Sequence, residues 1–395
     1  MHCMKPLVAF FAATLFFFAL LPVAAQEDVE VGAAQVVSYA PFLKNKTLGI
    51  VANQTSMVGD THLVDTLLRM DAKIIRIFCP EHGFRGNADA GESVTNYIDP
   101  QTEIPVVSLY GERKKPTTAQ LQGIDVMFFD LQDVGARFYT YISTLHYVME
   151  ACAQNGIPLV ILDRPNPNGH YVDGPVLESA FKSFVGMHPV PVVHGMTIGE
   201  YAQMINGEGW LANGISCSLM VIPCKNYSHT VRYFLPVPPS PNLKSMMAIY
   251  LYPSTCFFEG TSFSLGRGTS DPFTMYGHPD FPDTAYSFVP QSMPGAKLPP
   301  LMGRTCYGVN LSLVDPESFF ERPGLRLSYL LDAYNRTPDK ARFFVPYFEK
   351  LAGTAQLRAQ IKKGMSEEQI RETWEPKLSE FRELRSRYLI YRDFK

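Results

Sequence analysis

The chain lacks the short motifs that mark the common metal, cofactor and nucleophile sites. It has no CxxC pair, no HExxH, no GxSxG and no EF-hand loop, and no GxGxxG follows its first strand-like segment. A Gly-rich segment around Arg267 lacks the lysine of a P-loop. We therefore expect neither a cofactor nor a metal. A metal site of mixed oxygen and nitrogen ligands stays open as an alternative, from Glu81, His82, Asp130 and Asp163.

Charge of one sign and clustered cysteines are also scarce. The formal net charge is −3, which argues against a nucleic-acid partner and against a polybasic segment that binds a membrane surface. The seven cysteines are scattered, and we expect most of them to be small buried residues. Cys217 and Cys224 are close enough in sequence for one disulfide in an oxidising compartment.

The one long apolar run stands at the N-terminus. Lys5 precedes an apolar stretch over residues 7–21, and small residues follow at 23–25. This pattern predicts a secretory signal peptide over residues 1–25. A retained anchor is the alternative, but the stretch is short for a bilayer span. We expect an exported protein, periplasmic or secreted, with no stable membrane insertion after cleavage.

The first half of the chain holds short apolar runs separated by helix-like segments. The runs do not alternate with polar residues, so they read as strands buried on both faces of a parallel sheet. Segments with helical spacing, at 61–70, 117–122 and 140–155, lie between them. This alternation predicts an α/β, Rossmann-like domain with a mostly parallel sheet. The expected strands are residues 47–51, 73–78, 104–109, 126–129 and 158–162.

A Pro-rich segment at 236–241 marks the approach to a domain boundary, because proline interrupts both helices and central strands. Before it, Thr197 and Glu200 have the spacing of a capping box and predict a helix that runs to about residue 205. We expect a Rossmann-like domain over residues 30–243 and a smaller α+β domain over 244–395. The smaller domain is expected to contain a strand and a charged helical end, at 307–313 and 366–387.

Polar residues follow directly after each predicted strand. In open α/β sheets, ligands bind outside the carboxyl ends of the strands, so these clusters should converge on one cleft. A Gly-rich segment of the second domain presents Glu259 and Arg267. The strand-end candidates for catalysis or substrate binding are Glu81, His82, Asp130, Asp133, Arg137, Tyr139, Asp163, Arg164, Asn166 and Asn168.

Two glutamates, Glu81 and Glu92, lie at the ends of a loop that contains three glycines and can bend tightly. Such a pair suits glycoside hydrolysis, in which one carboxylic acid protonates the leaving oxygen and a second carboxylate acts as base or nucleophile. Ordinary solvated charge is the alternative for both. Similarly, Asp133 can instead cap the next helix, and Arg137 can instead pair internally with a strand-end aspartate.

Six motifs of this sequence, taken together, resemble those of one known family. They are Pro-Glu-His-Gly-Phe-Arg-Gly at 80–86, Ala-Gly-Glu at 90–92, Asp-Leu-Gln-Asp-Val-Gly-Ala-Arg at 130–137, Asp-Arg-Pro-Asn-Pro at 163–167, Phe-Glu-Gly-Thr at 258–261 and Gly-Arg-Gly-Thr at 266–269. The chain resembles the NamZ family over nearly its whole length after the signal peptide. The resemblance implies an exo-β-N-acetylmuramidase, which removes N-acetylmuramic acid from the non-reducing end of peptidoglycan fragments. It also implies a site in the cleft between a Rossmann-like domain and a smaller C-terminal domain.

For that substrate, Arg137 or Arg267 is expected to bind the lactyl carboxylate, because a guanidinium forks onto a carboxylate with defined geometry. Glu92 is the expected general acid, with Glu81 or Asp133 as the second carboxylate. The expected contacts to the sugar face, the hydroxyls and the acetamido group come from Tyr139 or Tyr141, His82, Asn166 and Asn168.

Two other classes of function stay open. One is a metal-dependent hydrolase of another bond, such as an amide or a phosphoester. The other is a non-catalytic protein that uses the cleft to hold glycan ends. The expected partner is a peptidoglycan glycan that ends in N-acetylmuramic acid. The sequence leaves open the oligomeric state and whether hydrolysis retains or inverts the anomeric configuration.

Overall fold

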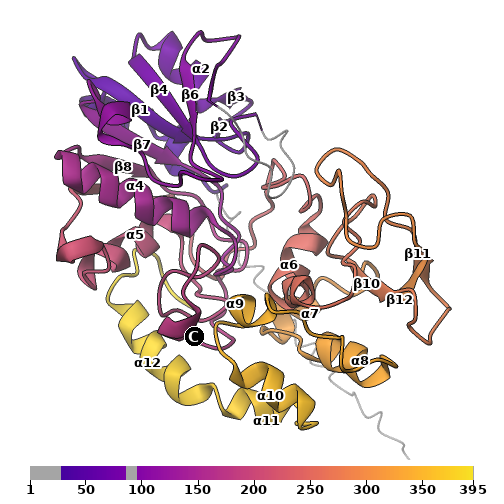
Figure 1. The fold of residues 1–395 in the computed structure, drawn as a ribbon. Coiled ribbons are helices and arrows are strands. Elements are labelled where there is room, and N and C mark those ends of the chain that lie inside the picture. Colours follow the sequence, from indigo (N-terminus) through magenta and orange to yellow (C-terminus); the bar gives the residue numbers. More distant parts are fainter. Residues whose placement is uncertain (1–27, 86–95, 395) are drawn as a thin grey trace, which may run out of the picture.

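A seven-stranded sheet forms the centre of the first domain (Figure 1). The structure, a computed structural model, describes residues 28–85 and 96–394. Neighbouring strands of this sheet are parallel, except that the edge strand β5 is antiparallel to β6. The predicted Rossmann-like, mostly parallel sheet is therefore confirmed. In spatial order the strands are β5 (Tyr97–Ile98), β6 (Pro105–Ser108), β4 (Lys73–Cys79), β1 (Thr47–Ala52), β7 (Val126–Asp130), β8 (Leu159–Leu162) and β9 (Leu219–Ile222).

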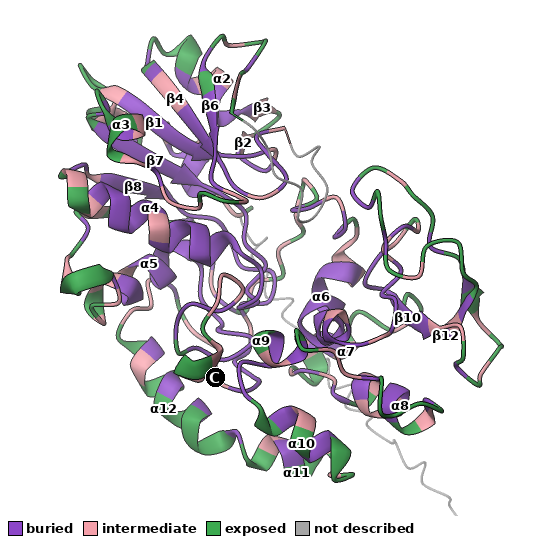
Figure 2. Cartoon of the chain, in the orientation of Figure 1, coloured by how far each residue is buried: buried purple, intermediate pink, exposed green. Residues whose placement is uncertain are grey.

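Helices cover both faces of this sheet. In β7, Met127 and Phe129 belong to the core shared with α4 (Tyr141–Asn155) and α5 (Ile198–Gly207). Phe128 belongs to the opposite core, shared with α2 (Leu63–Arg69). Successive side chains of a strand point to opposite faces, so a wholly apolar strand serves both cores. Figure 2 shows the strands and the inner sides of α4 and α5 buried.

The residues that predicted the start of one helix and the end of another are found at those helix ends. Thr197 and Glu200 form the predicted capping box at the start of α5. Gly156 takes a left-handed conformation with φ 65° and ends α4. The helix predicted from residue 61 begins later, because Thr61–His62 pairs as β3 with β2 (Met57–Val58). The other short elements of this domain are η1 (Gly32–Ala34), α1 (Val36–Tyr39), η2 (Ala40–Phe42), α3 (Thr118–Leu121), η3 (Ser179–Phe181) and η4 (Ala212–Gly214).

The second domain is a small antiparallel sheet surrounded by helices and long loops (Figure 1). Its strands lie in the order β10 (Met275–His278), β12 (Cys306–Asn310) and β11 (Ser287–Phe288). Its helical elements are α6 (Met246–Thr255), η5 (Cys256–Gly260), α7 (Ser318–Glu321), α8 (Ser328–Arg336), α9 (Phe348–Ala352), α10 (Gln356–Lys362), α11 (Glu367–Glu372) and α12 (Glu375–Ser386).

The predicted charged helical end is two helices rather than one. The helix α11 ends at Glu372, and α12 begins at Glu375 with Pro376 in its first turn. Proline has no backbone N–H to continue the preceding helix but fits the first turn of a new one. A break at this point therefore follows from the sequence.

The end of the chain returns to the first domain. Arg385, in α12, donates from Nε and Nη2 to the carbonyl of Gly195, at 3.1 and 2.5 Å. The hydroxyl of Tyr391 donates to Oδ2 of Asp163 at 2.6 Å. The end of the chain, from Arg385 in α12 onward, therefore contacts the first domain.

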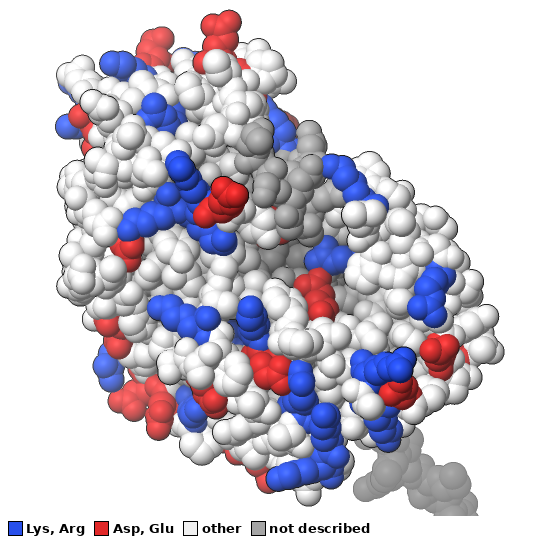
Figure 3. Space-filling model, in the orientation of Figure 1, with Lys and Arg blue, Asp and Glu red and all other residues white. Residues whose placement is uncertain are grey.

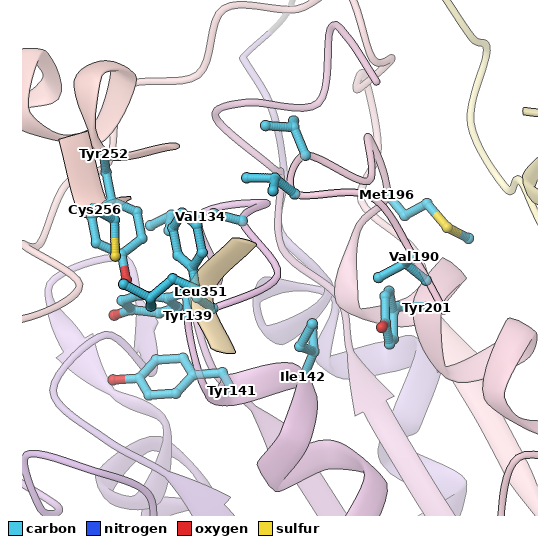
Figure 4. Packing of buried hydrophobic residues seen from close by; sticks show 14 of the residues in the cluster. Val134, Tyr139, Tyr141, Ile142, Val190, Met196, Tyr201, Tyr252, Cys256 and Leu351 are labelled. Atoms are coloured by element: carbon cyan, nitrogen blue, oxygen red, sulfur yellow. The ribbon is translucent and has the colours of Figure 1, made fainter. Parts of the chain in front are cut away.

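One continuous hydrophobic core joins the two domains. The ring of Phe138 meets Tyr252 and Phe257 edge to face, with centroids 5.3 and 5.9 Å apart. In Figure 4, Tyr139 and Tyr252 lie beside Leu351 at the same boundary. Edge-to-face aromatic packing adds directional preference to hydrophobic burial, so the two domains are held in a defined arrangement.

Cys217 and Cys224 do not form a disulfide. All six described cysteines are buried and unbridged. Cys217 and Cys224 lie on either side of β9, and an extended strand rises about 3.3 Å per residue. That separation exceeds the distance that a disulfide can bridge. Within residues 28–85 and 96–394, no helix is long and apolar enough to cross a bilayer.

Candidate active site

A pocket lies at the carboxyl end of the sheet, where the two domains meet. Glu81 and His82 line it just after β4, and Tyr110 lines it after β6. The second domain contributes Glu259 and Arg267 to the opposite wall. Figure 3 shows the surface hollowed between the two domains, beside the grey residues. The cleft is thus where strand ends of an open α/β sheet place a ligand.

Glu81 is held by hydroxyl groups from two other segments. Oγ1 of Thr140, the residue before α4, donates to Oε2 of Glu81 at 3.2 Å. Tyr110 also hydrogen-bonds to Glu81. Burial is the main cause that raises the pKa of Tyr110, and the negative charge of Glu81 raises it further. The phenol therefore stays protonated at neutral pH and can donate. These contacts fix the orientation of the carboxylate in the pocket.

The turn after β4 has an unusual backbone. His82 and Gly83 both take left-handed conformations, with φ 73° and 76°. Glycine adopts this region freely, but a residue with a side chain adopts it at a cost. Backbone strain of this kind gathers at functional sites, where the surrounding structure maintains it. Here it turns the chain so that Glu81 and the buried His82 line the same pocket.

The opposite wall carries an ion pair. Nε and Nη2 of Arg267 donate to Oε1 of Glu259 at 2.8 and 2.5 Å. The two side chains keep 20 and 26 % of their surface exposed. Gly266 and Gly268 flank the arginine with positive φ, and a Cβ on Gly268 would lie 2.4 Å from a backbone oxygen. The Gly-Arg-Gly sequence is therefore required for the close turn that presents Arg267 to the pocket.

Five of the predicted site residues line this pocket. The tyrosine among them, Tyr139, donates its hydroxyl to the carbonyl of Pro239 at 2.8 Å. Its neighbour Tyr141 lines the pocket as well. The predicted residues that the structure brings together are Glu81, His82, Tyr139, Glu259 and Arg267.

Asp130 and Arg164 are paired with each other instead of facing the pocket. Nε and Nη2 of Arg164 donate to the two carboxylate oxygens of Asp130 at 2.5 and 2.9 Å. Both side chains are buried. The pair ties the end of β7 to the loop after β8, so we assign it a structural role in place of the expected substrate contact.

The remaining polar residues after β8 are also used internally. Asp163 accepts hydrogen bonds from Thr197 Oγ1, Gly199 N and Tyr391 Oη, between 2.6 and 2.8 Å. Asn166 donates to the carbonyl of Met196 at 2.9 Å. Asn168 donates to the carbonyls of Val134 and Ile249, at 2.9 and 3.1 Å. These groups hold backbone and helix ends in place, which explains why none of them faces the pocket. The alternative metal site is also not formed, because Asp130 and Asp163 point to these separate partners.

Arg137 joins the two domains from a fully buried position. Nη1 donates to the carbonyls of Pro175 and Val190, both at 2.7 Å. Nη2 donates to the carbonyls of Leu351 and Ala352, at 2.9 and 2.8 Å. Arg137 does not line the pocket where we expected it to bind a substrate carboxylate, and it forms no internal pair with Asp130 or Asp163. The guanidinium instead binds the last carbonyls of α9.

Asp133 lies buried behind the pocket. Its Oδ2 accepts from Gly135 N at 2.6 Å, while Oδ1 has no partner among the described residues. Nε2 of His194 lies 3.9 Å from Oδ2. Burial raises the pKa of Asp133 to about 7 and lowers that of His194 to about 3. Asp133 neither lines the pocket nor caps α4, whose first residue follows Thr140.

One predicted catalytic residue, Glu92, lies outside the described residues. Its role as general acid therefore stays a prediction. Sequence reasoning also missed pocket residues that belong to no motif. Tyr347 precedes the short helix α9, and Asn242 follows the Pro-rich segment. Tyr110 directly follows the predicted strand 104–109, so its place in the cleft agrees with the expectation for strand-end clusters, although it was not among the candidate residues.

Comparison with known proteins identifies the family. The model of the N-terminal domain of exo-β-N-acetylmuramidase NamZ matches residues 48–247, and the model of its C-terminal domain matches residues 250–391. The chain belongs to the NamZ family. A Bacillus subtilis member, peptidoglycan β-N-acetylmuramidase NamZ, is 40 % identical over 374 residues, which cover 89 % of each chain.

Two crystal structures of DUF1343-family proteins from Bacteroides fragilis have the same fold. One is 49 % identical, covers 93 % of this chain and all of its own, and superposes with a TM-score of 0.87. The other is 26 % identical, covers 92 % of this chain and 99 % of its own, and superposes with a TM-score of 0.79. Both domains of this chain therefore have counterparts in the two crystal structures.

The buried carboxyl of Asp133 predicts a pH dependence of stability. Its pKa rises from 3.8 in the unfolded chain to about 7 in the folded protein. Between pH 3.8 and about 7 this carboxyl is protonated in the folded protein but ionised in the unfolded chain. The free energy of unfolding therefore falls as the pH rises. Asp133→Asn replaces this carboxyl with an amide that does not titrate. The variant should gain stability relative to wild type, by about 3 kcal/mol, when the pH is changed from 5 to 8.

Urea unfolding at pH 5 and pH 8 measures this difference. Asp60→Asn, at an exposed loop position, is the matched control and should show the same difference from wild type at both pH values. If Asp133→Asn also differs from wild type by an equal amount at the two pH values, the carboxyl does not titrate in the folded protein as described.

Proposed function

We propose that this protein is an exo-acting glycoside hydrolase that releases terminal N-acetylmuramic acid from the non-reducing end of peptidoglycan fragments. Family models over both domains and the 40 % identical peptidoglycan β-N-acetylmuramidase support this activity. The observation that carries the proposal is the arrangement of the pocket. A carboxylate, Glu81, lines one wall, and a partly exposed cation, Arg267, lines the other.

The cation matches the feature that distinguishes N-acetylmuramic acid from N-acetylglucosamine. N-acetylmuramic acid carries a lactyl carboxylate, and a guanidinium binds such a group with charge-assisted hydrogen bonds. Nε and Nη2 of Arg267 already bind Glu259, while Nη1 has no hydrogen-bond partner among the described residues. With Arg137 held internally, Arg267 is the residue to which we assign the lactyl carboxylate.

The carboxylates match the chemistry of glycoside hydrolysis. This reaction needs an acid for the leaving oxygen and a second carboxylate as base or nucleophile. Glu81 is oriented by Thr140 and Tyr110, which suits the second role. We assign the acid to Glu92, on the loop that follows Glu81. We also propose export after removal of residues 1–25, because peptidoglycan lies outside the cytoplasm.

The activity is tested with purified protein that starts at Gln26. A chromogenic β-N-acetylmuramide and its N-acetylglucosamine analogue are incubated with the protein, each with and without EDTA. We expect release from the muramide only, with no effect of EDTA. Loss of release in EDTA would favour a metal-dependent hydrolase, and binding of the muramide without release would favour a glycan-binding protein.

The catalytic assignment is tested in the same assay. Glu81→Gln keeps the size of the side chain but removes its charge, so kcat should fall by about 10²–10⁴-fold while folding is unchanged. Glu112→Gln, at an exposed position of the next strand-end loop, should retain wild-type activity. Glu92→Gln should also abolish turnover. Near-normal activity of either site variant would remove that glutamate from the mechanism.

A further inference from the structure

A second cavity opens beside the candidate active site. It has a volume of about 340 Å³ and is lined entirely by the second domain. We call it the apolar alcove, because four of its nine lining residues, Phe263, Leu265, Pro300 and Leu301, are apolar and Tyr347 adds an aromatic ring. Its size lies at the lower end of the range of small-molecule sites, about 300–1,000 Å³. Apart from Arg267 and its partner Glu259, the residues that line this cavity have no part in the proposed reaction.

The alcove is continuous with the active-site pocket. Glu259, Arg267 and Tyr347 line both cavities. Tyr347 lines the active-site pocket together with Glu259 and Glu81, and both carboxylates add to the effect of burial in raising the pKa of its phenol. A ligand whose end occupies the pocket can therefore extend past the ion pair and the Tyr347 ring into the alcove.

The chemistry of the alcove suits a neutral, partly apolar ligand. Its charged lining groups, Glu259 and Arg267, are paired with each other. Phe263 and Leu265 are each 3 % exposed and form a fixed floor. Tyr347 is 37 % exposed and presents part of its ring. Hydroxyls of Thr261 and Ser262 supply polar atoms at the same wall.

We propose that the apolar alcove binds the sugar on the leaving-group side of the scissile bond. That sugar in peptidoglycan is a neutral N-acetylglucosamine residue, which has an apolar C–H face and a rim of hydroxyls. The aromatic and aliphatic side chains of the alcove contact the apolar C–H face of this sugar. The hydroxyls and the ion pair of the alcove hydrogen-bond to the hydroxyl groups at its rim. This inference rests on the proposed function. It adds that the enzyme recognises two sugars rather than one.

A stem peptide is the competing occupant, because it is also attached to N-acetylmuramic acid. The charges in the alcove argue against it. Stem peptides carry free carboxylates, and a buried or half-buried charge needs a partner of opposite sign. Nε and Nη2 of the alcove's arginine already bind Glu259, and its Nη1 is assigned to the lactyl carboxylate, so the described lining residues offer no further cation for the carboxylates of a peptide. A neutral sugar has no such requirement.

The test uses two substrates that differ only in the leaving group. One is the disaccharide in which N-acetylmuramic acid is β-linked to N-acetylglucosamine. The other is β-N-acetylmuramyl fluoride, whose leaving group is too small to enter the alcove. Ser262→Trp places a large ring in the alcove and leaves Glu81, Glu92 and Arg267 unsubstituted. Ser262→Ala is the matched control, because it leaves the volume open.

We expect Ser262→Trp to lower kcat/KM for the disaccharide by about tenfold or more, the usual scale for a lost pocket contact, and to leave hydrolysis of the fluoride within about twofold. Ser262→Ala, which removes one hydroxyl but leaves the volume open, should lower kcat/KM for the disaccharide far less than Ser262→Trp does and should hydrolyse the fluoride as wild type does. Leu301→Ala, which removes part of the wall instead of filling the cavity, should lower kcat/KM for the disaccharide selectively. It keeps the test valid if the tryptophan variant does not fold.

Equal losses on both substrates, or no loss on the disaccharide, would overturn the alcove as a sugar subsite. A loss confined to disaccharides that carry a stem peptide would assign the alcove to the peptide instead and would also overturn the proposal. Failure of the proposed function has a different signature, since wild-type protein would then hydrolyse neither the disaccharide nor the fluoride.

Discussion

The guanidinium of Arg137 fixes the geometry on which the cleft depends. It donates four hydrogen bonds to backbone carbonyls, two in the first domain and two at the end of α9 in the second. Burial lowers its pKa to about 9, so it stays charged at neutral pH. Tyr347 lies directly before α9 and lines both cavities. Holding the end of this short helix therefore also holds a wall of the site. Gly353 is part of the same arrangement, because a Cβ there would lie 2.6 Å from Nη2 of Arg137.

The polar residues at the strand ends divide into two groups with different tasks. One group, which includes Glu81 and His82, faces the pocket. The other group, which includes Asp163 and Asn168, binds backbone groups and helix starts behind it. Loops at the end of a buried sheet carry many polar backbone groups, and nearly all of these must find partners. A site whose side chains are held in fixed positions therefore needs polar residues behind it as well as in it.

This division explains how much the sequence could predict. The strands were predictable because an apolar run such as 126–129 must be buried on both faces, whatever its neighbours are. The position of the site followed from the strand ends. The direction of each polar side chain did not, because it depends on partners far away in sequence. Arg137 is 214 residues from Leu351, and Asp163 is 228 residues from Tyr391. No local pattern around either residue reveals such a partner.

Equilibrium unfolding of Arg137→Met by urea tests the central claim most directly. The substitution leaves four buried carbonyls without their donor, at a cost of about 1–3 kcal/mol for each group that finds no other partner. We predict a loss of at least about 3 kcal/mol. Arg336→Met, which removes a half-exposed surface arginine of the second domain, should change the free energy of unfolding by about 1 kcal/mol or less. Equal stability of the two variants would contradict the account. An unchanged stability of Arg137→Met with a raised KM for the muramic substrate would instead return Arg137 to the substrate-binding residues.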